Sequence, residues 1–260
     1  MVTLSVDGVE YRYGDQPVFS DISLSINSGE VISVIGRNGA GKSTLIKCIN
    51  HILSPHKGTV LIDDEDVAHM TQRKRARRFG YLSQKSEQLF PSTVFDVVLT
   101  GRYPHSPFKF TRNDEAITAR VLAMMELDSF SDRSFNRLSG GEQQQVLIAR
   151  ALAQEAEVLL FDEPTNNLDL QHQLRIMGLI RKLSRERHIT SVLAIHELNF
   201  AASYSDRVIV LHNGTILANG NPMEVFTAEM VREAFGVPVK IYYHHGAPHI
   251  ALLPGEEESL

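Results

Sequence analysis

The stretch Gly36-Arg37-Asn38-Gly39-Ala40-Gly41-Lys42-Ser43 decides the fold, because it fits the pattern G-x-x-x-x-G-K-[ST]. An apolar run at residues 31–35 precedes it and predicts a buried strand, and residues 42–52 follow it with a helical pattern. Glycines let a loop turn its N–H groups inward, and a helix N-terminus adds partial positive charge. The stretch therefore predicts a phosphate-binding loop. A chance glycine-rich turn is the minor alternative.

Short apolar runs alternate with helical patterns along much of the chain. Further strands are predicted at residues 79–83, 158–161 and 191–195. A helix is predicted where Leu170, Leu174, Met177, Ile180 and Leu183 keep a helical spacing. Alternation of this kind is typical of an α/β protein whose parallel sheet is covered by helices on both faces.

Four regions depart from that alternation. Residues 4–26 alternate with period two and predict an antiparallel β-layer, whereas residues 86–154 carry helical patterns and predict an inserted helical subdomain. The dipeptide Asn213-Gly214 between two apolar runs predicts a hairpin with a type I′ turn. Residues 239–253 predict one more strand pair around Gly246-Ala247-Pro248, and residues 256–260 are expected to fray.

Composition excludes several classes of protein. Of the 260 residues 43% are hydrophobic and 22% charged, which argues against a disordered chain. The net charge of −5 makes a dedicated DNA coat a poor candidate. Cys48 is the single cysteine, so no intrachain disulfide forms, and no apolar run approaches the ~18 residues of a membrane span. The N-terminus does not match a signal peptide, so we expect a cytosolic chain with at most a peripheral membrane role.

Two carboxylates follow the strand at residues 158–161. Asp162 is expected at the carboxyl end of that strand, beside the phosphate loop, where α/β sheets bind ligands. Its oxygens suit Mg²⁺, together with the Ser43 hydroxyl, while Lys42 reaches the β- and γ-phosphates. Glu163 lies just beyond and is expected to polarise an attacking water. A solvated pair that caps a turn before Pro164 is the alternative.

A second anion site is predicted at Leu138-Ser139-Gly140-Gly141-Glu142, which precedes a helix at residues 143–154. Ser139 is a plausible cap, and the two glycines expose the first N–H groups of the helix. The segment has no adjacent lysine and lies in the helical insert, away from the phosphate loop of its own chain. It is therefore either a helix cap alone or part of a phosphate site on another copy.

Together these motifs resemble the ATP-binding subunits of ABC transporters over about residues 4–234. Residues 138–142 match the family's LSGGE signature, between the phosphate loop and the Asp-Glu strand as expected. Other matches are the Q-loop glutamine Gln84, the D-loop Asn167-Leu168-Asp169, the switch histidine His196 and the adenine-stacking aromatic Tyr13. Asn167 stands where many members have Ala, and Gln145 stands where the family usually has Arg; the latter should alter helix packing more than chemistry.

The resemblance implies a P-loop NTPase fold of the ABC ATPase type: a parallel-sheet core, an N-terminal antiparallel β-layer and an inserted helical subdomain. One domain is expected over residues 1–260, with a nucleotide-binding core at about 1–85 and 155–235, a signature subdomain at about 86–154 and a C-terminal extension at about 236–260. ATP and Mg²⁺ are the implied cofactors. Two copies would bind ATP head to tail, each ATP lying between the phosphate loop of one and the signature of the other.

The resemblance also assigns the site residues. Those expected to contact the nucleotide are Tyr13, Gly36, Arg37, Asn38, Gly39, Ala40, Gly41, Lys42, Ser43, Thr44, Ser139, Gly140, Gly141 and Asp169. Those expected at Mg²⁺ are Ser43, Gln84 and Asp162. Those expected in catalysis are Glu163, His196 and Gln84.

A finer resemblance points to one group of importers. Residues 93–99, the segment 101–105 and Phe235-Gly236-Val237-Pro238 are similar to ATPases that import iron–siderophore, haem or cobalamin. This implies permease subunits in the inner membrane, an extracytoplasmic binding protein and a peripheral position on the cytoplasmic face. A zinc or manganese importer ATPase and a soluble ATPase of iron–sulfur assembly remain alternatives. An ATPase that acts on DNA or ribosomes is weaker, because the chain has neither paired ATPase domains nor a long coiled coil.

Two clusters of basic residues are interpreted without a binding role. The cations at positions 73, 74, 75, 77 and 78 are expected on a solvated helix face rather than at nucleic acid, because no aromatic residues lie between them. His244, His245 and His249 suggest a metal site. Adjacent strand residues point to opposite faces, however, so we expect none.

Overall fold

The strand before the glycine-rich loop lies near the middle of a six-stranded sheet in the computed structural model, which describes residues 2–83, 92–166, 168–244 and 246–253. The strands are β3 (Val31–Ile35), β6 (Phe79–Leu82), β7 (Val158–Asp162), β8 (Thr190–Ala194), β9 (Arg207–His212) and β10 (Thr215–Gly220). Their order is β10-β9-β3-β8-β7-β6, and every neighbouring pair except β10–β9 is parallel. The predicted α/β fold with a parallel-sheet core is confirmed.

The hairpin β9–β10 turns at the predicted dipeptide. Asn213 has φ 47° and Gly214 has φ 77°, so both central residues adopt the positive φ of a type I′ turn. The adjacent strands β3, β7 and β8 are buried at every position, because helices cover both faces of the sheet.

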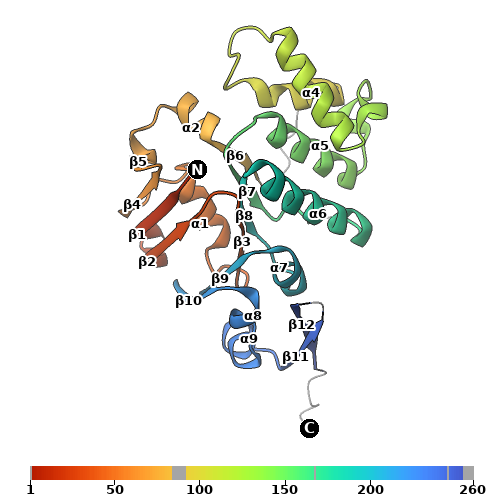
Figure 1. Ribbon diagram of the computed structural model, residues 1–260. Helices are drawn as coiled ribbons and strands as arrows, with labels where there is room; N and C mark the ends of the chain where they lie inside the picture. Colours follow the sequence, from red (N-terminus) through yellow and green to blue (C-terminus); the bar gives the residue numbers. More distant parts are fainter. Residues whose placement is uncertain (1, 84–91, 167, 245, 254–260) are drawn as a thin grey trace.

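A second sheet covers one side of the molecule, and a helix lies between the two sheets (Figure 1). Its strands are β1 (Leu4–Tyr13), β2 (Gln16–Ile26), β4 (Lys57–Ile62) and β5 (Glu65–Asp66), in the antiparallel order β2-β1-β4-β5. Helix α1 (Lys42–Ile49) buries Leu45, Ile46 and Cys48 in a cluster with residues of both sheets. The antiparallel β-layer is confirmed, and α1 ends three residues before the predicted position 52.

The helical insert lies beyond the edge strand β6. It contains α3 (Val94–Leu99), η2 (Thr100–Arg102), α4 (Arg112–Met124), η3 (Asp128–Phe130), η4 (Phe135–Arg137) and α5 (Gly140–Ala153). Within the described residues 92–154 no strand forms, as predicted. The prediction for α5 was three residues late: Ser139 and Glu142 form a reciprocal capping box, which starts the helix at Gly140.

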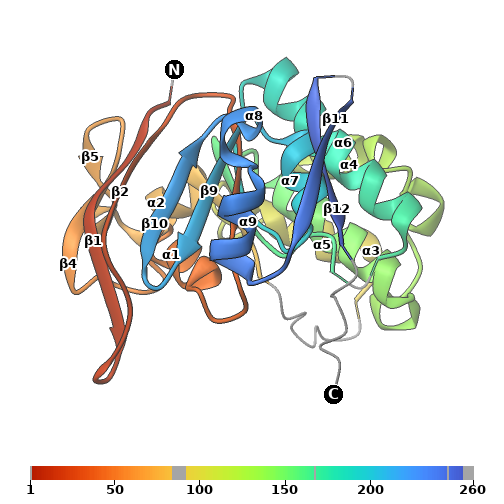
Figure 2. The ribbon, with the colours of Figure 1, turned by 90° about the horizontal axis from the view of Figure 1, so that it is seen from below.

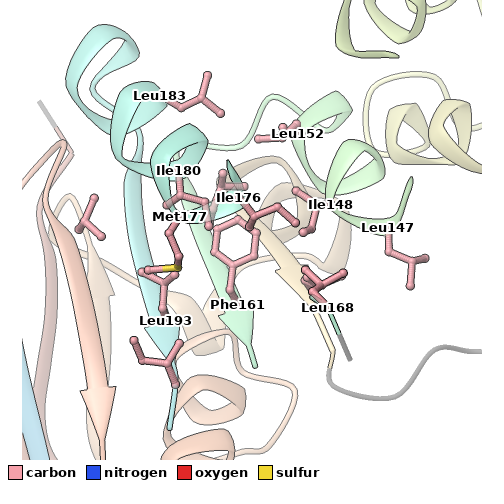
Figure 3. Packing of buried hydrophobic residues seen from close by; sticks show 14 of the residues in the cluster. Leu147, Ile148, Leu152, Phe161, Leu168, Ile176, Met177, Ile180, Leu183 and Leu193 are labelled. Carbon is pink, nitrogen blue, oxygen red and sulfur yellow. The ribbon is translucent and has the colours of Figure 1, made fainter. Parts of the chain in front are cut away.

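Helices α5 and α6 (Leu170–Arg187) cover the face of the sheet opposite α1. Phe161 of β7 packs between residues of both helices, including Ile148 and Met177 (Figure 3). Two apolar residues of the predicted α6 pattern behave differently: Leu170 is 66% exposed and Leu174 is 43% exposed. The buried stripe of α6 therefore begins only at its second turn.

A helical and hairpin segment completes the fold beside β9. It comprises α7 (Leu198–Tyr204), α8 (Pro222–Val225), α9 (Ala228–Phe235) and the pair β11 (Val239–His244) and β12 (Ala247–Leu252). The predicted C-terminal strand pair is confirmed, and it lies beside α7 (Figure 2). The Asn199 side chain fastens it there, exchanging two hydrogen bonds of 2.8 and 3.1 Å with the Ile250 backbone.

Two short helices connect β5 to β6, namely η1 (Val67–His69) and α2 (Gln72–Arg78). Helix α2 carries the cluster of cations and buries none of its residues. Its cations are partly paired, since Lys74 binds Glu65 and Arg73 donates to the Pro104 carbonyl at 3.0 Å. Within the parts of the chain that are described, no helix is long and apolar enough to cross a membrane.

Candidate nucleotide site

Two positions of the glycine-rich loop have no room for a side chain, which explains why they are glycines. Gly36 has φ 153°, and a Cβ there would overlap the carbonyl oxygen of Leu211. Gly41 has φ 99°, and its Cβ would lie 2.9 Å from Val18 Cγ1. Gly41 also caps α1 without a side-chain hydrogen bond. The first N–H groups of α1 therefore have no side-chain acceptor, which suits them to an anion.

Lys42 is held against the backbone of its own loop. Its Nζ donates to the carbonyl oxygens of Gly36 at 2.8 Å and Arg37 at 3.1 Å, and the residue is only 5% exposed. Burial lowers the pKa of the ammonium, while the charges of Glu163 and Asp162 act in the opposite direction. The result is a fixed cation beside the loop that could balance the charge of a phosphate.

Ser43 and Asp162 form the oxygen pair that a magnesium ion would need. Ser43 Oγ donates to Asp162 Oδ1 at 2.6 Å, and burial raises the pKa of the Asp162 carboxyl. Among the described residues, the Tyr81 hydroxyl on the neighbouring strand β6 is buried without a hydrogen-bond partner. Burial and the charge of Asp162 raise the pKa of Tyr81. Hard oxygen donors with an unused hydroxyl beside them fit Mg²⁺ and its water ligands.

Glu163 lies at the centre of a small polar cluster. Its Oε1 is hydrogen-bonded to His196 Nε2, and its Oε2 accepts from Asn166 Nδ2 at 3.1 Å. Glu163 has φ 56°, a left-handed conformation that is strained for a glutamate and that clusters at functional sites. Sequence reasoning missed Asn166. Its position three residues after Glu163, in the turn that follows β7, was the available signal.

One surface cavity of about 740 Å³ brings together Lys42, Ser43, Glu163, Asn166 and His196, whereas Asp162 does not line it. Its lining residues are Tyr13, Val18, Asn38, Gly39, Gly41, Lys42, Ser43, Thr44, Glu163, Asn166 and His196. Gly36, Arg37 and Ala40 belong to the same loop but do not line the cavity. Tyr13 ends β1 and is 52% exposed, so its ring is available to a planar ligand. Val18 is the other lining residue that sequence reasoning did not identify.

The other predicted site residues lie elsewhere. Ser139, Gly140 and Gly141 begin α5 and do not line this cavity. Asp169 caps α6, accepting from the His172 backbone N–H at 2.9 Å, and does not line it either. Gln84 and Asn167 are outside the described residues.

The signature segment is an ordered helix start rather than a loose loop. Ser139 N donates to Glu142 Oε2 at 2.7 Å, and the Glu142 N–H donates to Ser139 Oγ at 3.3 Å. Hydrogen bonds from Ser139 lower the pKa of the Glu142 carboxyl. Gly140 is exposed, and a Cβ there would meet open space. The segment therefore presents Gly140 to the surface, whereas Gly141 is half-buried beside Leu168.

Of the three C-terminal histidines, the structure describes His244 and His249. Among the described residues no group of three His, Cys, Asp or Glu side chains could hold a metal ion. His245 is outside that set. The absence of a metal at this hairpin stays a prediction.

The sequence profile of the ABC transporter family matches residues 19–166 of the chain. An uncharacterized ABC transporter ATP-binding protein of Methanocaldococcus jannaschii is 45% identical, covering 95% of this chain and 97% of its own. The hemin import ATP-binding protein of Rhodococcus jostii is 37% identical over 99% of this chain and 88% of its own. The ferric enterobactin transport ATP-binding protein of Escherichia coli is 36% identical over 86% and 84%.

Solved structures agree with these relatives. An inward-facing ABC transporter assigned to the metal-chelate type superposes with TM-score 0.84 at 27% identity, and 100% of each chain is covered. A dimeric ATP-binding cassette in a post-hydrolysis state, bound to ADP and Pi, has TM-score 0.75 at 30% identity. It covers 84% of this chain and 98% of that one.

Proposed function

Because the chain belongs to the ABC transporter family and is an ATPase coupled to transport, we propose that it energises an importer for an iron–siderophore, haem or cobalamin-type substrate. The observation that carries the ATPase chemistry is the cavity in which Lys42, Ser43, Glu163 and His196 meet. The importer class rests on the relatives named for hemin and ferric enterobactin, and on the finer resemblance of the helical insert.

Each side chain of the cavity has a role that its geometry supports. The N–H groups at the start of α1 and the Lys42 ammonium bind the phosphates, and the Tyr13 ring stacks on the base. Ser43 and Asp162 would hold Mg²⁺, with Gln84 as a further ligand by resemblance. When bound, the ion neutralises charge on the phosphate oxygens. These contacts act mainly by holding the reacting groups in position, which is the main catalytic requirement of phosphoryl transfer.

Hydrolysis needs a base for the attacking water, and Glu163 is the proposed one. Its carboxylate lies beside Lys42 and is hydrogen-bonded to His196 and Asn166, which fix its orientation. Glu163 takes the proton of the attacking water, and His196 contacts the γ-phosphate. Gln84 is proposed to position the water and the ion.

Two copies of the chain would complete each site. The signature residues Ser139, Gly140 and Gly141 start α5 but do not line the cavity of their own chain. The Ser139 N–H is already bonded to Glu142, and Gly140 is exposed. In a head-to-tail dimer they would supply donors to the phosphate held by the other copy, and Asp169 would approach the same interface. The ADP-bound relative is itself dimeric, which supports this arrangement.

The remaining proposals concern partners and domain boundaries. The dimer would dock on two permease subunits at the cytoplasmic face of the inner membrane and act indirectly on an extracytoplasmic binding protein. We divide the chain into a nucleotide-binding core at about residues 1–85 and 155–235, a helical signature subdomain at about 86–154 and an extension at about 236–260. Nucleic acid is not a proposed partner.

Reconstitution tests this function and its alternatives. The chain is co-expressed with candidate permease and binding-protein subunits, and ATP-driven uptake of haem, a ferric siderophore or cobalamin is measured in proteoliposomes. Glu163→Gln serves as the matched inactive variant. We expect uptake of one of these cargoes with the native chain only. Uptake of zinc or manganese instead would reassign the cargo. An ATPase that stays out of washed membranes even with the permease present would favour the soluble assembly role.

A further inference from the structure

A second cavity, of about 480 Å³, lies at the opposite edge of the central sheet from the phosphate loop. Its lining includes Ser28, Glu157 and Ile189, which come shortly before β3, β7 and β8. The phosphate loop, Glu163 and His196 come after the carboxyl ends of the same three strands. The second cavity is therefore separate from the nucleotide site, and we call it the amino-edge pocket.

The walls of the amino-edge pocket are apolar and come from both the helical insert and the core. Helix α4 contributes Ile117, Val121 and Met124, and the core adds Ala156 and Ile189. Leu152 and Leu183 close it from α5 and α6, where Figure 3 labels them at one end of the buried cluster. Pockets of 300–1,000 Å³ at subdomain boundaries are the usual sites for small molecules.

The rim of the amino-edge pocket carries two acidic and two basic side chains, and these differ in how they are paired. Glu155 is paired with Arg102 at 2.9 Å, and Glu157 is paired with Arg78 at 3.2 Å. Among the residues that the structure describes, the exposed Arg120 of α4 and Arg187 of α6 have neither an ion pair nor a hydrogen bond of their side chains. Each acid of the rim thus has a guanidinium partner, although Arg102 is shared with Asp114 and Arg78 with Asp63. The guanidinium groups of Arg120 and Arg187 keep all their donors.

We propose that the amino-edge pocket binds an anionic amphiphile, with an apolar body in the cavity and one carboxylate or sulfonate at Arg120 and Arg187. An apolar lining of this size rewards burial of a hydrocarbon or aromatic body. A planar guanidinium binds a carboxylate through two parallel N–H donors, and two of them at one rim select an anion over a neutral head group.

Such a ligand would also act on the ATPase. The pocket is built from α4 and α5 of the insert on one side and from α6 of the core on the other, so a bound molecule holds these parts in one relative orientation. If the two parts move relative to each other during turnover, the ligand changes the rate by its different affinity for the two arrangements. This regulatory site goes beyond the proposed import function and does not depend on the cargo.

Dodecanoate and dodecanol are the matched probes, since they share a chain and differ in the charge of the head group. Each is titrated into the purified full-length chain by calorimetry, without nucleotide or Mg²⁺ and below micelle-forming concentrations. We expect dodecanoate to bind at one site per chain and at least about tenfold more tightly than dodecanol. Equal binding of the two probes, or no binding of dodecanoate, would overturn the proposal.

Charge reversal at the rim locates the site. In Arg120→Glu/Arg187→Glu we expect dodecanoate affinity to fall at least about tenfold, whereas Arg185→Glu, an exposed change on the same helix outside the lining, leaves it unchanged. If the double variant does not fold, as judged by circular dichroism, Arg120→Gln/Arg187→Gln takes its place. Undiminished binding in a folded double variant refutes the site. Because the titration contains no nucleotide, the result is independent of the proposed transport function.

Discussion

Ser43 Oγ donates a 2.6 Å hydrogen bond to Asp162 Oδ1, although 119 residues separate the two in the chain. Ser43 lies in the first turn of α1, and Asp162 ends β7. Helix α1 packs across the sheet on the face to which Asp162 belongs, which brings the two together. The fold therefore presents two hard oxygen donors side by side before any metal binds.

Ser43→Ala should weaken the response to Mg²⁺. The variant loses one oxygen donor, so we expect the free Mg²⁺ needed for half-maximal ATP hydrolysis to rise by about 10–100-fold. It also leaves the buried Asp162 carboxylate without its donor, which should lower the free energy of unfolding by about 1–3 kcal/mol. Ser43→Thr keeps the hydroxyl and should restore both properties. An unchanged Mg²⁺ requirement in Ser43→Ala would remove Ser43 from the metal site.

Glu163→Gln should separate binding from hydrolysis. The amide keeps the size of the side chain and can still bond His196 and Asn166, but it cannot take a proton. We expect ATP to bind with near-native affinity while hydrolysis falls by about 10²–10⁴-fold, the scale of a lost general base. Glu186→Gln, the same change at an exposed position of α6, should hydrolyse ATP normally. Near-normal turnover by Glu163→Gln would falsify the assignment of the base.

A buried ion pair in the helical insert predicts pH-dependent stability. Arg102 Nε donates to Asp114 Oδ1 at 3.0 Å, with both residues buried. Burial acts to raise the pKa of the Asp114 carboxyl, but hydrogen bonds from Thr111, Ser106 and Arg102 lower it by more. A carboxyl whose pKa is depressed in the folded state stabilises above its unfolded pKa of about 3.9, and this contribution is lost as the pH falls toward the folded pKa.

Asp114→Asn should accordingly lower the free energy of unfolding by about 3 kcal/mol at pH 7, because the buried Arg102 loses the negative charge that compensates its own. The difference from the native chain should shrink as the pH falls below about 4. Urea unfolding at pH 7 and near pH 2.5 measures this difference, with the exposed Asp128→Asn as the control. A cost that is the same at both pH values would show that the charge of Asp114 does not matter.

Patterns local in the chain predicted most of the fold. The G-x-x-x-x-G-K-[ST] motif, the apolar strands and the Asn213-Gly214 turn each depend on neighbouring residues, and the structure has all three. Boundaries were less accurate: the start of α5 was placed three residues late, although its capping box of Ser139 and Glu142 is also a local pattern. The contact of Asn166 with Glu163 depends on a turn conformation, and the amino-edge pocket depends on how distant helices pack. Neither leaves a periodic signal in the sequence.

The proposed composite site predicts different outcomes for two arrangements of the dimer. Ser139→Arg places a large cation at the exposed start of α5 and should block closure on the other copy, while a single chain still binds nucleotide. Lys42→Ala removes the fixed charge on the phosphates and should abolish hydrolysis in its own loop. Homodimers of either variant should therefore be inactive, whereas Ser129→Arg, an exposed change in the same insert, should be tolerated.

A mixed dimer of one Lys42→Ala chain and one Ser139→Arg chain distinguishes a signature that acts on the other copy from one that acts on its own chain. If each signature acts on the other copy, both lesions fall in one composite site and the second site keeps all its groups, so hydrolysis of up to about half the native rate can remain. If each signature acts on its own chain, both sites carry a lesion and activity disappears. Differently tagged chains purified in tandem, with the membrane partner present, provide the assay. The shared site is rejected if the mixed dimer is as inactive as the two homodimers while Glu163→Gln chains still form dimers with ATP under the same conditions. It is also rejected if Glu163→Gln chains stay monomeric with ATP even when the membrane partner is present.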